Sequence, residues 1–112
     1  MKITVEDRDE GIVVRPEQSH INADRAIEFR RRLQGAVGQS GGWIVLDFRE
    51  VEFIDSSGLG ALVSVLKKAG LQGRVRFCGV RSGPRSILEL TRLDRIFPVH
   101  RSVEEAVAGF QD

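Results

Sequence analysis

The apolar stretch WIVLDF, from Trp43 to Phe48, restricts the fold of this chain more than any other feature. A strand that is apolar on both faces has to be covered on both sides, which is typical of a central strand with parallel neighbours. The run therefore predicts the middle strand of a sheet. In the connection that follows it, Val51 and Phe53 are expected to point inward.

Strand and helix patterns alternate on either side of this run. The predicted strands are 2–5, 11–15, 43–48, 75–80 and 98–100, the first two forming a hairpin and the last lying at an edge. The predicted helical segments are 22–37, 57–68, 81–97 and 102–110. The order β-β-α-β-α-β-α-β-α indicates a single α/β domain over residues 1–112, with a mixed, largely parallel sheet of five strands and four helices.

The predicted helices carry terminal signals and apolar stripes. Asn22 is the expected N-cap of the first helix, with Asp24 in its first turn. Gly70 is the expected C-terminal cap of the second, and Ser102 with Glu105 forms an S-x-x-E capping box before the last. The residues expected to face the core at helical spacing are Ala26, Phe29, Leu33, Val37, Leu59, Leu62, Val63, Leu66, Ile87, Leu90, Leu93, Val103, Ala106, Val107 and Phe110.

Composition excludes several classes of protein. The formal net charge of +1 argues against a dedicated nucleic-acid binder, which usually carries a basic face. No apolar run approaches the ~18 residues of a membrane-spanning helix, and the N-terminus does not resemble a secretory signal, so a cytoplasmic protein without membrane insertion is expected. The single cysteine, Cys78, cannot form an internal disulfide and is expected to be buried.

The segment IDSSGLG, from Ile54 to Gly60, allows two interpretations. Asp55, Ser56 or Ser57 could each cap the helix that follows, with no further function. However, Gly58 and Gly60 each cost about 0.5–1 kcal/mol relative to alanine in a helix, so they require a compensating reason. One reason is close approach of another backbone or of a ligand. Another is an open helix N-terminus, which favours an anion such as a phosphoryl group on Ser56.

One face of the second helix is a candidate docking surface because its side chains are small or weakly polar. It comprises Ser57, Ala61, Ser64, Val65 and Lys68, with Gly60 beside them. The alternative is an ordinary half-exposed helix face. The arginines at 30–32 on the first helix are interpreted as a solvated face, with contact to a charged partner as the alternative.

Catalysis is not expected. A serine hydrolase needs the elbow G-x-S-x-G, but isoleucine and aspartate stand two positions before the serines of DSSG. His20 and His100 are the only histidines, and both are expected to be surface or connecting residues. The chain has no phosphate-binding glycine motif and no metal-ligand spacing, so no cofactor or metal is expected.

The segment VLDFREVEFIDSSGLGALVSVLKKA resembles the signature region of the STAS family, in particular the bacterial anti-sigma factor antagonists. The order of elements is similar to that family from Ile3 to Phe110. The resemblance implies a STAS-like fold and phosphorylation of the first serine after the aspartate, Ser56. It also implies that Asp55, Ser57, Gly58 and Gly60 belong to the docking surface.

The resemblance also implies partners. These are an anti-sigma factor that acts as a serine kinase and a metal-dependent serine phosphatase; the unphosphorylated form would bind the anti-sigma factor and release a sigma factor. Asn22 departs from the family, which commonly has an aspartate there near the phosphorylation site. STAS-like domains also serve as subunits or regulators of membrane transporters, including lipid transport systems, and this alternative needs no phosphorylation. A monomer or weak dimer is expected.

Overall fold

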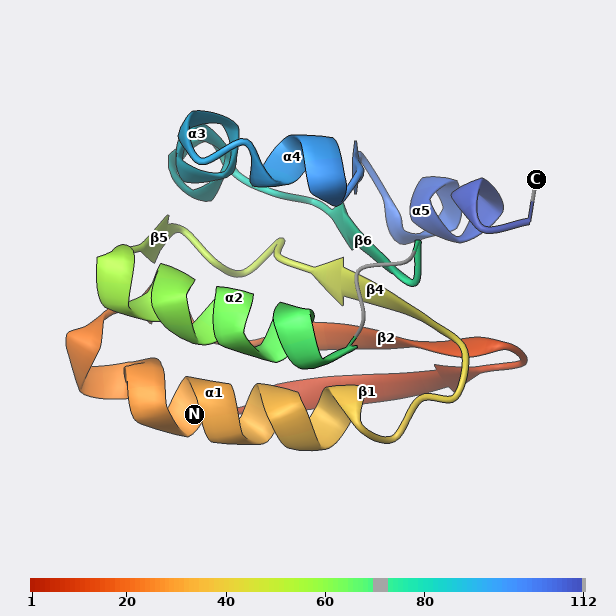
Figure 1. The fold of residues 1–112 in the computed structure, drawn as a ribbon, viewed down its shortest axis with the longest axis horizontal. Helices are drawn as coiled ribbons and strands as arrows, with labels where there is room; N and C mark the ends of the chain where they lie inside the picture. The colour runs from red at the N-terminus through yellow and green to blue at the C-terminus, as the bar shows by residue number, and fades with distance from the viewer. Residues whose placement is uncertain (70–72, 112) are drawn as a thin grey trace.

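A five-stranded mixed sheet in the order β1-β2-β4-β6-β7 forms the centre of the computed structural model, which describes residues 1–69 and 73–111 (Figure 1). The strands of this sheet are β1 (Ile3–Arg8), β2 (Gly11–Pro16), β4 (Trp43–Asp47), β6 (Val75–Cys78) and β7 (Val99–His100). β1 and β2 are antiparallel, and every other pair is parallel. The predicted hairpin, the central position of β4 and the edge position of β7 are confirmed.

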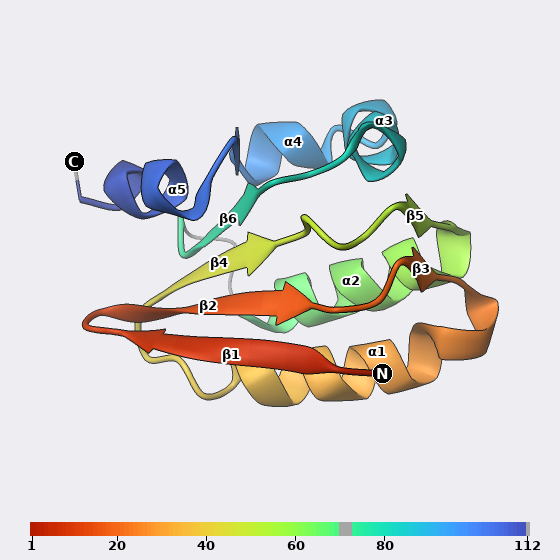
Figure 2. The same cartoon turned by 180° about the vertical axis from the view of Figure 1, so that it is seen from behind.

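Five helices accompany this sheet in the described ranges. They are α1 (Ala23–Val37), α2 (Ser56–Ala69), α3 (Ser82–Leu90), α4 (Leu93–Ile96) and α5 (Val103–Gly109). Two short strands, β3 (His20–Ile21) and β5 (Phe53–Ile54), pair in parallel as a separate ladder. Because β3 immediately precedes α1 and β5 immediately precedes α2, this ladder brings the starts of both helices together (Figure 2).

The two faces of the main sheet are covered differently. α1 and α2 pack side by side on one face, where Phe29, Leu33, Leu62 and Leu66 meet the inward residues of the strands. The short helix α5 covers part of the other face, with Ala106 buried against Val13, Val45 and Cys78. The alternation of side chains along each strand assigns neighbouring residues to opposite faces, so the apolar run in β4 supplies both cores.

The segment 81–97 differs from its prediction as one helix. Arg92 has φ 62°, a left-handed conformation that ends α3 and begins the single turn α4. Within α3 the buried side chains are Pro84 and Leu88, so Leu90, which projects from the opposite side of the helix, is 84% exposed. The expectation that Leu90 faces the core in register with Leu93 is therefore wrong.

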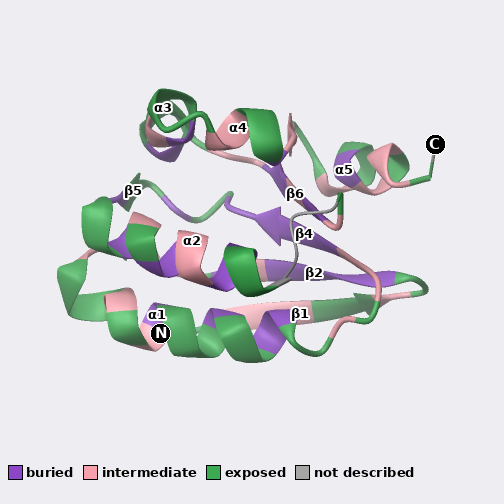
Figure 3. Ribbon diagram, viewed as in Figure 1, coloured by how far each residue is buried: buried purple, intermediate pink, exposed green. Residues whose placement is uncertain are grey.

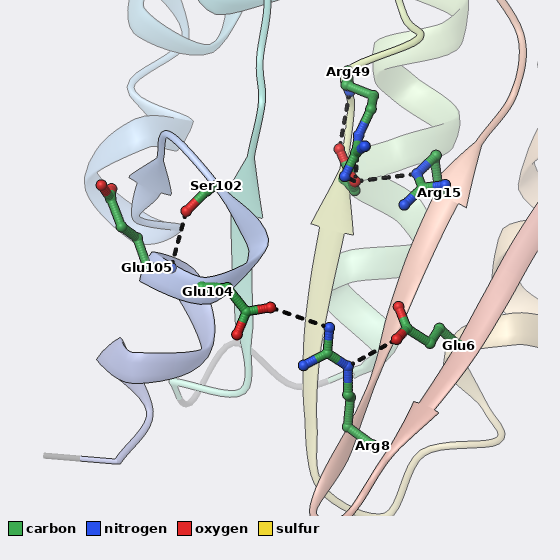
Figure 4. Close-up of polar contacts among 8 residues, drawn as sticks. Glu6, Arg8, Arg15, Arg49, Ser102, Glu104 and Glu105 are labelled. Atoms are coloured by element: carbon green, nitrogen blue, oxygen red, sulfur yellow. Dashed lines mark hydrogen bonds and ion pairs between the residues drawn. The ribbon is translucent and has the colours of Figure 1, made fainter.

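Two further local expectations concern the connections. Val51 is buried as expected, but Phe53 is 45% exposed and its ring lies 5.7 Å from that of His20. Ile54 takes the inward position in β5, so its neighbour faces outward. The predicted cap at Gly70 lies outside the described residues. At α5 the Ser102 side chain accepts from the Glu105 amide, as Figure 4 shows, which confirms that half of the capping box.

Candidate functional site

The N-termini of α1 and α2 meet at the carboxylate of Asp55. Its Oδ1 accepts the amide hydrogen of Gly58 at 2.9 Å in the first turn of α2, and its Oδ2 accepts that of Ala23 at 3.1 Å in the first residue of α1. Its own amide donates to the Ile21 carbonyl at 3.2 Å, which fixes the residue to β3. One carboxylate thus neutralises part of the positive end of two parallel helices.

This arrangement answers which residue of the DSSG motif is the cap. Since Asp55 takes that position, neither serine hydroxyl is needed, and both Ser56 and Ser57 are exposed. In the described part of the chain, neither hydroxyl makes a hydrogen bond, and the amides of these first two helical residues find no acceptor. Ser56 therefore presents a free hydroxyl beside unpaired N–H groups, a geometry that suits an anion.

Asn22 occupies the predicted N-cap position, but its side chain does not cap the helix. Its backbone is extended, with φ −113° and ψ −172°, and its carbonyl accepts from the Arg25 amide at 3.0 Å. The amide of Ala23, the first residue of α1, donates to Asp55, which directly precedes α2. The Oδ1 atom of Asn22 is buried without a hydrogen-bond partner in the described residues. The expectation of a local side-chain cap is therefore wrong: the amide of Arg25, which an N-cap side chain could accept, donates to the backbone carbonyl of Asn22.

The surroundings of the two glycines in the motif differ, so one explanation does not account for both. A Cβ at Gly58 would lie 2.4 Å from the carbonyl oxygen of Ile21, so glycine permits the close approach of α2 to β3. A Cβ at Gly60 would meet nothing within 4 Å, and this glycine is exposed on the helix surface. Close backbone contact, one of the two explanations for these glycines, thus applies to the first and not to the second.

The predicted docking face of α2 is only partly accessible (Figure 3). Ala61 and Val65 are 8% and 2% exposed, because α1 packs along that side of the helix. The expectation that these two side chains form an open face is wrong. Ser57, Gly60 and Lys68 are exposed and Ser64 is half-buried.

A shallow groove runs between α1 and α2 next to the serines, with a volume of about 240 Å³. It is lined by Ala26, Ile27, Arg30, Ser57, Gly60, Ala61 and Ser64. Ile27 is 67% exposed there. Ile27 was not among the residues predicted from the sequence, and Arg30 was predicted only as part of a solvated face or a contact to a charged partner. The sequence feature that could have indicated Ile27 is its position outside the apolar stripe of the first helix, where a large apolar side chain is left exposed.

A second polar cluster lies at the carboxyl end of β4. Asp47, 1% exposed, accepts from the Nε of Arg15 at 3.1 Å and from that of Arg49 at 2.8 Å, and Figure 4 shows both arginines reaching the same carboxylate. Burial opposes its charge, but the hydrogen bonds from the arginines outweigh burial and lower the pKa of Asp47. Cys78 is buried, as predicted. Burial raises the pKa of its thiol to about 12.

The histidines do not activate the motif serines. His20 bonds the Ser19 hydroxyl at 3.0 Å, and His100 bonds Arg76 at 3.0 Å. Across the described ranges no group of three or more histidine, cysteine or acidic side chains is placed to hold a metal ion. No helix in residues 1–69 and 73–111 has both the length and the apolar character needed to span a bilayer.

The fold and site define a small α/β domain that presents a serine at the meeting point of two helix N-termini. Residues 2–106 match the family model of the STAS domain, and the chain belongs to that family.

A protein of Bordetella bronchiseptica named "Putative anti-sigma factor antagonist BtrV" is 30% identical over 112 residues, covering 99% of this chain and 96% of the relative. The crystal structure of an anti-sigma factor antagonist from Mycobacterium paratuberculosis has a TM-score of 0.86 at 27% identity, covering 99% of this chain and 94% of its own. An anti-sigma factor antagonist (STAS) domain protein from Planctomyces limnophilus shares the fold with a TM-score of 0.83 at 20% identity, covering 98% of both chains. The homologues of this chain are thus anti-sigma factor antagonists, and the transporter alternative is not favoured.

Proposed function

We propose that this protein is an anti-sigma factor antagonist switched by phosphorylation of Ser56. In its unphosphorylated form it binds an anti-sigma factor that is also a serine kinase, and a sigma factor is released. A metal-dependent serine phosphatase restores this form. The chain acts as substrate and binding module, not as catalyst. The observation that carries the proposal is that Asp55 caps both helices, which leaves the Ser56 hydroxyl exposed and without an internal role.

Phosphorylation would act on the interface and not on the fold. The phosphoryl group adds about −1.5 to −2 charge, which a helix N-terminus favours by about 0.3–1 kcal/mol. The unpaired amides of Ser56 and Ser57 are available to it. In a complex the same charge would be buried without a partner, at a cost of several kcal/mol. A penalty of about 3 kcal/mol weakens binding more than a hundredfold.

The docking surface we propose is the accessible part of the predicted set. Asp55 and Gly58 support it from below by fixing the start of α2 against β3. Ala61 and Val65 are buried where α2 packs on α1. They hold the two helices together, and their side chains are not accessible to a partner. The residues of this surface that are exposed or half-buried, and so within reach of a partner, are Asn22, Ser56, Ser57, Gly60, Ser64 and Lys68.

The test is to incubate the protein with ATP and each candidate anti-sigma factor kinase from the same genome, and to locate the phosphate by mass spectrometry. We expect a single phosphate on Ser56, full loss in Ser56→Ala, and retention in Ser57→Ala as the matched control. Titration calorimetry should then show binding that phosphorylation weakens more than about a hundredfold. A phosphate on Ser57, or equal affinity of both forms, would contradict the proposal.

A further inference from the structure

Positive charge is concentrated in the layer formed by α1 and α2. α1 carries four arginines against two acidic residues, and α2 carries two lysines and no acidic residue, so the layer has a formal charge of +4. The whole chain has +1, which leaves −3 for everything outside these two helices. The small net charge of the chain therefore conceals a strong asymmetry between this layer and the rest of the domain.

Much of this charge is not neutralised within the layer. Glu28 pairs with Arg32 at 3.0 Å and with the N-terminal amine at 3.4 Å. Arg25, Arg30 and Arg31 are exposed, and none of them has an ion-pair partner in the described part of the chain. A docked partner of opposite charge would find these guanidinium groups free to bind carboxylates in the bidentate manner that arginine favours.

The groove between the helices adds an apolar contact to this charged surface. Ile27 is 67% exposed at its wall, and Ala26, Gly60 and Ala61 give it low relief. Arg30 lines the same groove, and so does Ser57, the neighbour of Ser56 in α2. An aliphatic side chain seated beside Ile27 would therefore place an adjacent carboxylate within the field of Arg30.

We infer that the α1–α2 layer selects the partner, and that the partner surface is acidic with an exposed aliphatic side chain that enters the groove. This inference rests on the proposed function, since it describes the anti-sigma factor that recognises Ser56. It also explains the sign of the switch: phosphorylation adds negative charge at the end of the layer and so repels an acidic partner. The mixed character of the groove favours a protein over a membrane or a nucleic acid, because those ligands need basic charge without a pocket for one aliphatic side chain.

The test compares Arg30→Glu and Ile27→Asp with matched substitutions outside the layer, Arg95→Glu and Leu90→Asp. All four side chains are exposed, Leu90 to 84% and Ile27 to 67%. The thermal unfolding of each variant should therefore match that of the unchanged protein. The probe is the anti-sigma factor kinase that binds in the preceding experiment, measured by titration at low and high NaCl. Vesicles of phosphatidylglycerol with phosphatidylcholine and a duplex DNA are tested separately.

We expect the two groove variants to lose about tenfold or more in affinity, the two controls to bind as the unchanged protein, and high salt to weaken binding. If the groove variants bind normally while phosphorylation of Ser56 still abolishes binding, the inference is wrong and the proposed function stands. If the groove variants fail to bind but phosphorylation has no effect, the proposed function is wrong and the surface stands. Arg30-dependent binding to vesicles or DNA, without binding to a kinase, would overturn the choice of a protein partner.

Discussion

Replacing Asp55 tests the double cap at the centre of the site. Asp55→Ala removes two hydrogen bonds, to the amides of Gly58 at 2.9 Å and Ala23 at 3.1 Å. Loss of one N-cap costs about 1 kcal/mol, and loss of a carboxylate from a helix N-terminus about 0.3–1 kcal/mol. Because one side chain serves two helices, we expect the free energy of unfolding to fall by about 2–4 kcal/mol.

The measurement is urea unfolding at neutral pH, followed by circular dichroism and analysed with a linear dependence on urea. Asp55→Asn keeps one acceptor oxygen without the charge, so it should lose about half as much. Ser57→Ala is the matched control in the same turn and should stay within about 0.5 kcal/mol of the unchanged protein. In amide hydrogen exchange, Ala23 and Gly58 should both exchange faster in Asp55→Ala. A loss below about 0.5 kcal/mol, or faster exchange at one amide only, would refute a cap shared by two helices.

Further predictions concern the glycines, the buried carboxylate and the thiol. Gly58→Ala should destabilise by about 2 kcal/mol because its Cβ would lie 2.4 Å from the Ile21 oxygen, whereas Gly60→Ala should stabilise by about 0.5–1 kcal/mol; thermal melts of the pair decide. Because the pKa of Asp47 is lowered, its contribution is complete above the ordinary value of 3.8 and is lost as pH falls through the folded value. Asp47→Asn should therefore flatten the acid limb of the stability curve, and an unchanged slope would contradict this. With a pKa of about 12, Cys78 should react with a disulfide reagent at neutral pH only after unfolding; rapid reaction of the native protein would contradict its burial.

Features that depend on local sequence were predicted correctly. The hairpin, the central strand, the edge strand and the Ser102 cap follow from side-chain periodicity and from hydrogen bonds between residues close in sequence. The helix starting after Asp55 could be located for the same reason. These features need no information about which distant elements meet.

Other features depend on contacts between distant segments. Burial of Ala61 and Val65 follows from the packing of α1 on α2, and periodicity in α2 alone cannot show which side its neighbour covers. The break at Arg92 is a change of direction that helical spacing does not reveal.

The sequence by itself determined an alternating α/β domain with small and hydroxyl residues at the start of its second helix, because periodicity and turn chemistry act over a few residues. Only the tertiary structure decided that Asp55 serves both helices, that Asn22 does not cap its own with its side chain, and that Ser57 lies on a groove lined by Ile27 and Arg30. The physical reason is that the β3–β5 ladder brings together two helix starts more than thirty residues apart, so that an amide from each reaches a different oxygen of one carboxylate.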